Sequence, residues 1–168
     1  MAKVLITGMS GTGKSATLAE LERRGHRVVD TDDPGWSTWV MDAEEIGGGE
    51  CLWVEERMTE LLDLGDPRTL FVQGCVRNQR KYYERFDAIV LLSAPARVIL
   101  DRIATRTTNE YGKAPADREL ILHHLETVEP LLRAGCTHEL DATRALDDVV
   151  ADLIAISEAV GRDVEPSN

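Results

Sequence analysis

Eight residues near the amino terminus have the types and spacing of a phosphate-binding loop: Gly8-Met9-Ser10-Gly11-Thr12-Gly13-Lys14-Ser15. Glycines let the backbone wrap closely around an anion, so that successive N–H groups and a helix N-terminus point at phosphate oxygens. The Lys14 ammonium can reach the β- and γ-phosphates, and the Ser15 hydroxyl can bind the accompanying Mg²⁺. The motif predicts that the chain binds ATP with Mg²⁺. The expected contacts come from Gly8, Gly11, Thr12, Gly13, Lys14, Ser15 and Ala16.

Two flanking elements must hold this loop in place. Residues 3–7 form an apolar run typical of a buried strand, and residues 15–24 place Leu18 and Leu21 on one face of a helix. The alternative is a chance match in an ordinary glycine turn. The strand before the motif and the helix after it argue against that alternative.

A second set of candidate residues follows the next predicted strand, residues 27–30. Ligands of a parallel sheet bind beyond the carboxyl ends of its strands, so Asp30 and Asp32 should emerge at the same edge as the phosphate-binding loop. Alternate residues of an extended segment face the same side, which places both carboxylates near one site. One can bind Mg²⁺ and the other can accept or orient the proton of an attacking hydroxyl. A helix cap and turn cluster is the alternative.

Three arginines are candidates for contacting phosphate groups. The predicted strands at 69–73 and 88–92 end without an acid, which argues against a mechanical ATPase, but Arg77 follows the first of them at the ligand edge. Arg102 and Arg106 stand four residues apart where a predicted helix meets a polar, lid-like segment at about 106–116. A mobile segment can deliver arginines to the transferring phosphoryl group after substrate binds. We expect catalytic roles for Arg102 and Arg106 and a substrate-anion role for Arg77, with solvated surface arginines as the alternative.

A stretch of about residues 34–66 is predicted to be a helical insert between two strands. Two helices are indicated by apolar residues at helical spacing on either side of a glycine triplet at 47–49: Trp36, Trp39, Val40, Ala43 and Ile46 before it, and Leu52, Trp53, Met58, Leu61 and Leu62 after it. The three tryptophans either belong to the core or form a platform for a planar substrate. The sequence leaves that choice open.

The remaining chain continues to alternate helix and strand. We expect a long helix over residues 115–133, a last strand over 137–141, a final helix over 146–160 and a frayed end at 161–168. The turn at 142–144, which includes Arg144, is where an adenine base could rest.

Composition limits the expected partners. The chain has 168 residues, the size of one domain, with a net charge of −11 and a pI near 4.8. A nucleic acid or an anionic membrane would need a basic face, so neither is an expected partner. Three widely separated cysteines, Cys51, Cys75 and Cys136, suggest neither a disulfide framework nor a zinc site, and we interpret them as buried thiols. With no signal peptide or bilayer-length apolar run, we expect a soluble cytoplasmic monomer or homodimer.

Together these motifs resemble the small P-loop kinases of the nucleoside monophosphate kinase superfamily, which includes shikimate, gluconate and dephospho-coenzyme A kinases. The resemblance covers nearly the whole chain. It implies one domain over residues 1–168, with an α/β three-layer fold and a five-stranded parallel sheet in the order 2-3-1-4-5. Residues 30–32 match the D-x-D of shikimate kinases, which implies Asp30 as a metal ligand and Asp32 as the catalytic and substrate-binding acid. Gly74-Cys75-Val76-Arg77 is similar in place to the G-F-P-R of adenylate kinases, Arg102 and Arg106 to lid arginines, and residues 141–144 to an adenine loop.

Departures from these families leave the acceptor open. Val128 stands where shikimate kinases carry a carboxylate-gripping arginine, and Val76 stands where adenylate kinases carry proline. The acceptor-side arginine of adenylate kinases has no clear match, and Arg57 is a candidate substitute. The hypothesis is an ATP-dependent kinase that transfers the γ-phosphoryl group to a hydroxyl or phosphate of a small nucleoside, nucleotide or sugar-like acceptor. The alternative is a regulatory ATP-binding module with slow hydrolysis.

Overall fold

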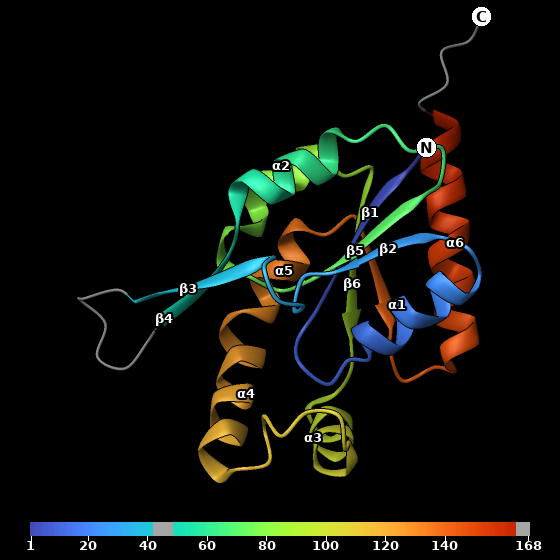
Figure 1. Cartoon of the computed structure of the whole chain (residues 1–168). Helices are drawn as coiled ribbons and strands as arrows, with labels where there is room; N and C mark the ends of the chain where they lie inside the picture. Colours follow the sequence, from blue (N-terminus) through green and yellow to red (C-terminus); the bar gives the residue numbers. More distant parts are fainter. Residues whose placement is uncertain (42–48, 164–168) are drawn as a thin grey trace, which may run out of the picture.

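A computed structural model describes residues 1–41 and 49–163 of the chain, and a parallel sheet forms its centre (Figure 1). The five strands of this sheet are β1 (Lys3–Thr7), β2 (Arg27–Asp30), β5 (Leu70–Gln73), β6 (Ala88–Ser93) and β7 (His138–Asp141). They lie in the order β2-β5-β1-β6-β7, and every neighbouring pair is parallel. Counted along the chain within this sheet, the order is 2-3-1-4-5, so the predicted topology is confirmed. The central strands are almost wholly apolar because helices cover both faces.

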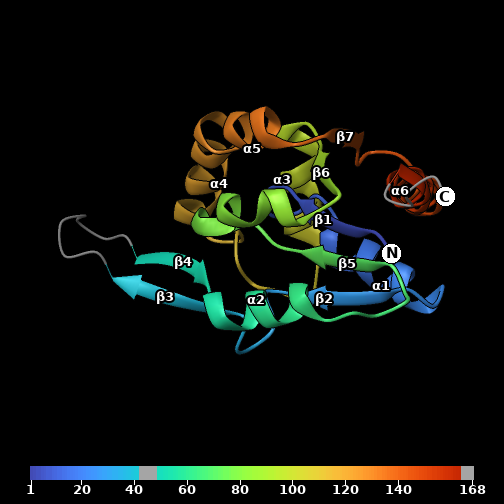
Figure 2. The same ribbon diagram turned by 90° about the horizontal axis from the view of Figure 1, so that it is seen from above.

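Helices form the outer two layers. On one face α1 (Lys14–Arg23) and α6 (Leu146–Asp163) pack against β1 and β6, with Leu21 and Leu153 fully buried. On the other face lie α2 (Glu55–Asp63) and the 3₁₀ helix η1 (Arg77–Arg85), packed around the alternate strand residues. Because successive strand side chains point to opposite faces, Ile6 joins the first cluster and Leu5 the second. Figure 2 shows these layers from above.

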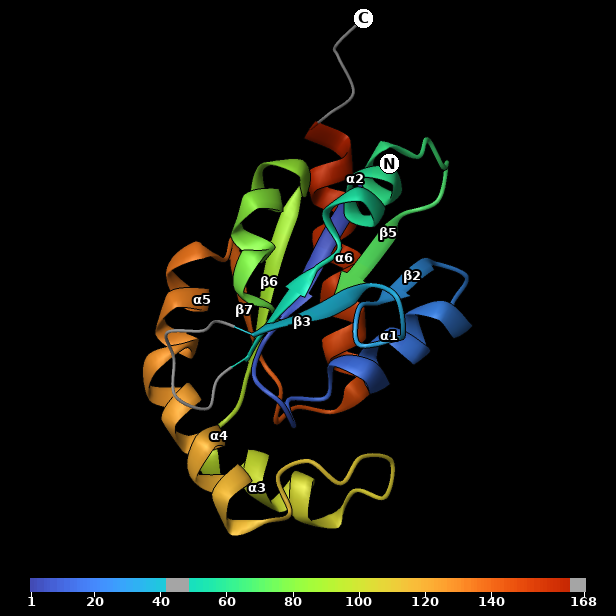
Figure 3. The same ribbon diagram turned by 60° about the vertical axis from the view of Figure 1, so that its left-hand side comes forward.

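A third group of helices runs from beyond the carboxyl ends of the strands back along the side of the sheet (Figures 1 and 3). It comprises α3 (Ala96–Thr105), α4 (Pro115–Thr127) and α5 (Glu129–Gly135), which share an apolar cluster with Met9 of the phosphate-binding loop. The expected single helix over 115–133 is wrong, because the chain breaks at Val128 between α4 and α5. Pro130 explains the break: it lacks an N–H and its ring is tolerated only in the first turn of a new helix.

The predicted helical insert is wrong over its first helix and at the start of its second, because Leu52 and Trp53 belong to a strand. Residues 37–41 form β3 (Ser37–Met41), which pairs antiparallel with β4 (Gly49–Trp53) so that Trp39 faces Cys51. The run Thr38-Trp39-Val40 consists of β-branched and aromatic residues, whose preference for extended backbone outweighed the apparent helical spacing. Of the expected helical residues, Ala43 and Ile46 lie outside the described residues. The hairpin projects from the rest of the chain (Figures 1 and 2), and only α2 of the insert is helical.

The three tryptophans have three different environments. Trp53 is 1% exposed and belongs to the core, whereas Trp39 is 70% exposed on the hairpin. Trp36 is partly buried, and the Arg57 guanidinium lies 4.9 Å from its ring centroid. The three tryptophans therefore do not share one role: Trp53 is a core residue and Trp39 is not.

Two expectations about the rest of the chain need correction. Each of the three cysteines is only partly buried in the structure rather than enclosed in the core. The final helix continues to Asp163, so the chain is helical for three residues beyond the expected end at 160. Within residues 1–41 and 49–163, no helix has both the length and the apolar composition needed to cross a bilayer.

Candidate functional site

The phosphate-binding loop joins β1 to α1 and has the backbone that its glycines predict. Gly8, Gly11 and Gly13 have φ of 147°, 83° and 93°, values that other residues adopt rarely. A Cβ on Gly8 would come within 2.4 Å of the Leu92 carbonyl oxygen, whereas one on Gly13 would meet nothing within 4 Å. No side chain caps the amino end of α1, so its first N–H groups are free to bind an anion. This loop has the geometry of a phosphate cradle.

Side chains of the loop fold back onto its own carbonyls. Lys14 Nζ donates to the carbonyl oxygens of Gly8 and Met9 at 2.8 and 3.1 Å, and Thr12 Oγ1 donates to the Met9 carbonyl at 2.9 Å. Since ammonium–carbonyl contacts of this kind are exchangeable, Lys14 is already positioned over the loop where a phosphate would replace them.

An acidic residue from β2 meets the start of α1. Ser15 Oγ donates to Asp30 Oδ2 at 3.2 Å, and the Asp32 backbone N–H donates to Asp30 Oδ1 at 2.9 Å. A hydroxyl beside a carboxylate is the kind of oxygen pair that Mg²⁺ binds together with water and phosphate oxygens. Among the residues that the structure describes, no group of three or more His, Cys, Asp or Glu side chains could hold a metal alone. The Ser15 hydroxyl and the Asp30 carboxylate are of the chemical kind that fits Mg²⁺.

A buried glutamine supports both acids, and sequence reasoning missed it. Gln73, at the end of β5, is fully buried, and its Nε2 donates to Asp30 Oδ1 and to Asp32 Oδ2, the second at 3.1 Å. The backbone carbonyl oxygen of Gln73 accepts a hydrogen bond from the Thr31 hydroxyl at 2.8 Å, and that hydroxyl accepts one from Trp53 Nε1–H at 2.9 Å. In the sequence, the only feature interpreted at this strand end is that it has no acidic residue. A polar residue closing an apolar strand beside the phosphate-binding loop was the available signal.

The two expected lid arginines contact different parts of the site. Arg106 Nη1 lies 3.5 Å from Ser10 Oγ of the phosphate-binding loop, while Nη2 donates to the Tyr111 carbonyl at 2.6 Å. Arg102 Nη2 donates to the carbonyl of Ala142, in the turn after β7, at 2.6 Å. Arg106 is thus next to the phosphates' expected place, and Arg102 is next to the predicted adenine turn.

Three other predicted arginines are paired with protein groups. Arg77 forms an ion pair with Glu50 of β4 and is 68% exposed at its side chain. Arg57 Nη1 donates to the Gly35 carbonyl at 3.1 Å, and Arg144 pairs with Asp152 of α6. None of the three contacts the phosphate-binding loop through a hydrogen bond among the described residues.

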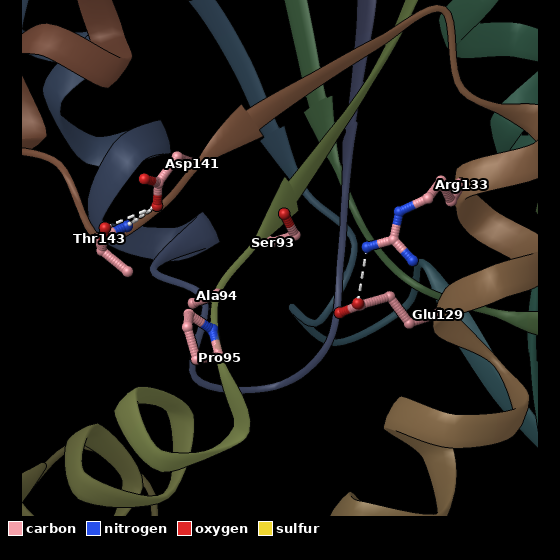
Figure 4. A pocket seen from close by; sticks show the side chains of 7 residues that line it. All are labelled: Ser93, Ala94, Pro95, Glu129, Arg133, Asp141 and Thr143. Atoms are coloured by element: carbon pink, nitrogen blue, oxygen red, sulfur yellow. Dashed lines mark hydrogen bonds and ion pairs between the residues drawn. The ribbon is translucent and has the colours of Figure 1, made fainter.

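An open pocket of about 420 Å³ lies at the carboxyl ends of β6 and β7, beside the predicted adenine turn (Figure 4). Its lining residues are Ser93, Ala94, Pro95, Glu129, Arg133, Asp141 and Thr143. Hydrogen bonds from the Thr143 hydroxyl and backbone N–H hold the pKa of Asp141 below its usual value. Ala142, whose carbonyl accepts the hydrogen bond from Arg102, lies in the chain between the lining residues Asp141 and Thr143. This position suits a site for one end of a nucleotide.

Burial is the main influence on the pKa of the Cys75 thiol, which lies close to the phosphate-binding loop. Desolvation raises the pKa of Cys75 above its usual value, although the charge of Lys14 acts in the opposite direction. A raised pKa keeps the thiol protonated at neutral pH, which argues against Cys75 as a nucleophile.

Fold and loop together define a P-loop nucleotide-binding protein with the architecture of the small kinases. The family model AAA_18, described as an AAA domain, matches residues 4–123, and the chain belongs to this family. Two curated relatives, the HPr kinase/phosphorylases of Bacillus cereus (strain B4264) and Bacillus anthracis (strain A0248), are each 40% identical over 91 residues. The match covers 53% of this chain but only 27% of each relative's length.

Solved structures share the fold at low sequence identity. Shikimate kinase from Acinetobacter baumannii, in complex with shikimate, gives a TM-score of 0.63 at 14% identity, covering 98% of this chain and 96% of that one. Deoxyadenosine kinase from M. mycoides, with bound dATP, gives 0.55 at 13% identity, covering 91% and 97%. A gluconokinase from Sinorhizobium meliloti 1021 gives 0.51 at 18% identity, covering 98% of both chains. The expected membership of the small P-loop kinase group is confirmed at the level of fold.

Proposed function

We propose that this protein is an ATP-dependent kinase that transfers the γ-phosphoryl group to a hydroxyl of a small acceptor. The observation that carries the proposal is the hydrogen bond between Ser15 and Asp30, 3.2 Å long. It joins Ser15, which follows Lys14 in the phosphate-binding loop, to Asp30 at the carboxyl end of β2. Mg·ATP, when bound, supplies the transferable phosphoryl group and neutralises part of its charge.

The chain's own residues then have separate tasks. Lys14 binds the β- and γ-phosphates, and Asp30 with Ser15 holds the cation's place. Arg106, beside Ser10, stabilises the charge on the transferring group. Asp32 orients the acceptor hydroxyl and takes its proton. Catalysis on this scheme is mainly positioning and electrostatic stabilisation.

The charges around the acids favour a hydroxyl acceptor over a phosphate acceptor. Arg77 and Arg57, the two arginines expected to bind an acceptor anion, pair with Glu50 and with the Gly35 carbonyl. Asp30 and Asp32 face the same region, so a second anion would meet net negative charge there. A neutral, hydroxylated acceptor avoids that repulsion.

A protein hydroxyl is the second candidate acceptor. The relatives that match part of this chain are named HPr kinase/phosphorylases, so their printed name gives HPr as what they act on. The β3–β4 hairpin carries three exposed apolar side chains, Trp39, Val40 and Met41, that a protein acceptor could cover. Both candidates use the same phosphate-binding loop and acids.

The test is ADP release from Mg·ATP against a panel of nucleosides, nucleoside monophosphates and hydroxylated metabolites, with Lys14→Ala as the blank. A hydroxylated acceptor that raises the rate well above background supports the proposal. Stimulation by monophosphates alone would contradict the hydroxyl assignment. Tight ATP binding with no stimulation by any small acceptor would favour the regulatory module or a protein acceptor.

A further inference from the structure

Gln73 occupies a position where the fold would otherwise bury an apolar side chain. It follows Phe71 and Val72 in β5, and all three residues are fully buried. Its Oε1 is buried with no hydrogen-bond partner among the described residues. A buried oxygen without a partner destabilises a folded chain, so the amide must serve another purpose.

The amide nitrogen of Gln73 serves that purpose, because it binds both acids. Nε2 donates to one carboxylate oxygen of Asp30 and one of Asp32. If the amide turned over, Oε1 would face two carboxylates and be repelled by both. The two acids therefore fix the orientation of the Gln73 amide. In that orientation Oε1 has no hydrogen-bond partner among the described residues.

We propose that Gln73 is a positioning residue, which holds Asp30 and Asp32 in the arrangement that phosphoryl transfer requires. The proposal rests on the function proposed above. An amide is suited to this task because it offsets the repulsion between the two acids without neutralising either. A lysine there would neutralise charge that a cation needs, and a glutamate would add a third repelling charge.

The backbone around Gln73 makes the side-chain effect separable. Thr31, which lies between the two acids, donates its N–H and its hydroxyl to the Gln73 carbonyl at 3.1 and 2.8 Å. These bonds do not depend on the side chain at position 73. A substitution can therefore remove the shared donor while Thr31 stays attached to β5.

Gln73→Met is the informative variant because it keeps length and burial and removes the donor. We expect kcat to fall at least about tenfold while KM for ATP changes by less than about threefold. Gln79→Met is the matched control: Gln79 is also buried, but its Nε2 donates to Thr7 and Tyr83 and contacts neither acid. The control should keep kcat within about threefold of the wild type when compared at equal folded fraction. Equal losses in the two variants would overturn the proposal.

A mutant cycle separates positioning from packing. If Gln73 acts only through the two acids, adding Gln73→Met to a variant that already carries Asp30→Asn and Asp32→Asn should cost little further turnover. Multiplied losses in that background would instead show that Gln73 acts independently of both acids and would overturn the proposal.

A crystal structure of Gln73→Met tests the inference without any activity. The Asp32 carboxylate should leave Asp30, while Thr31 remains bonded to the carbonyl of residue 73. An unchanged carboxylate pair would overturn the positioning role. Separated carboxylates together with a wild-type protein that phosphorylates no acceptor would support the positioning of the acids and contradict the proposed function alone.

Discussion

Arg106 Nη1 lies 3.5 Å from Ser10 Oγ, although the two residues are 96 positions apart in the sequence. This contact connects the end of α3 directly to the loop that is expected to bind the phosphates. The rest of the Arg106 fork is held by carbonyls of Asn109 and Tyr111 in the segment before α4. The segment that begins at Arg106 therefore contacts the phosphate-binding loop through this side chain.

Replacing Arg106 should impair the chemical step more than nucleotide binding. We expect Arg106→Ala to lower kcat about 100-fold, since a donor aimed at the transferring group is lost, with a smaller change in KM for ATP. Steady-state kinetics with a saturating acceptor measures both. Arg97→Ala, an exposed arginine in the first turn of the adjoining α3, is the control and should behave as the wild type. Equal kcat in Arg106→Ala and Arg97→Ala would exclude Arg106 from catalysis.

Arg102 should matter for nucleotide affinity. Its guanidinium holds the Ala142 carbonyl at 2.6 Å, and a charged hydrogen bond of this kind is worth about 1.5–3 kcal/mol. We expect Arg102→Ala to loosen the turn at 142–144 and to weaken ATP binding about tenfold. Isothermal titration with a non-hydrolysable ATP analogue measures the change. Unaltered affinity would place the base of the nucleotide elsewhere.

Asp32 should act on turnover. Asp32→Asn keeps the shape of the side chain but removes the proton acceptor, so turnover should fall about 100-fold while ATP affinity stays nearly intact. Asp33→Asn, one residue further on and exposed, is the matched control. Equal turnover in Asp32→Asn and the wild type would remove Asp32 from the chemistry.

Stability should depend on pH through His26. Burial lowers the pKa of His26 below its ordinary value of 6.5, and its ring packs edge-on against Phe71 at 5.2 Å between centroids. The unfolded chain therefore binds the proton more readily, so the free energy of unfolding should fall as the pH drops through 6.5. Urea unfolding at pH 5.5 and 7.5 should show a smaller difference in His26→Gln than in His138→Gln. An identical difference in the two variants would contradict this assignment.

The main sheet and the phosphate-binding loop could be predicted from sequence because their signals are local. Each central strand is a short apolar run, and the glycines, Lys14 and Ser15 specify their own backbone and chemistry. The position of Asp30 at the carboxyl end of a parallel strand likewise predicts that it lies near the phosphate-binding loop, and in the structure Ser15 donates to it.

The hairpin and Gln73 could not be predicted in the same way. Trp36, Trp39 and Val40 fit a helical period as well as a strand period over so few residues, and only pairing with β4 decides between them. The role of Gln73 depends on two acids 43 and 41 positions away in sequence, which come together only when β5 pairs with β2. Long-range contacts of this kind leave no periodic signal in the sequence.

The central claim is that the γ-phosphoryl group of ATP is transferred to a hydroxyl, and product analysis tests it most directly. Labelled [γ-³²P]ATP, incubated with the wild type and the best acceptor from the panel, should give a labelled phosphate ester, and Lys14→Ala should give none. Label that appears only as inorganic phosphate, at the same rate with and without acceptor, would contradict the claim and identify a hydrolysing nucleotide-binding module instead.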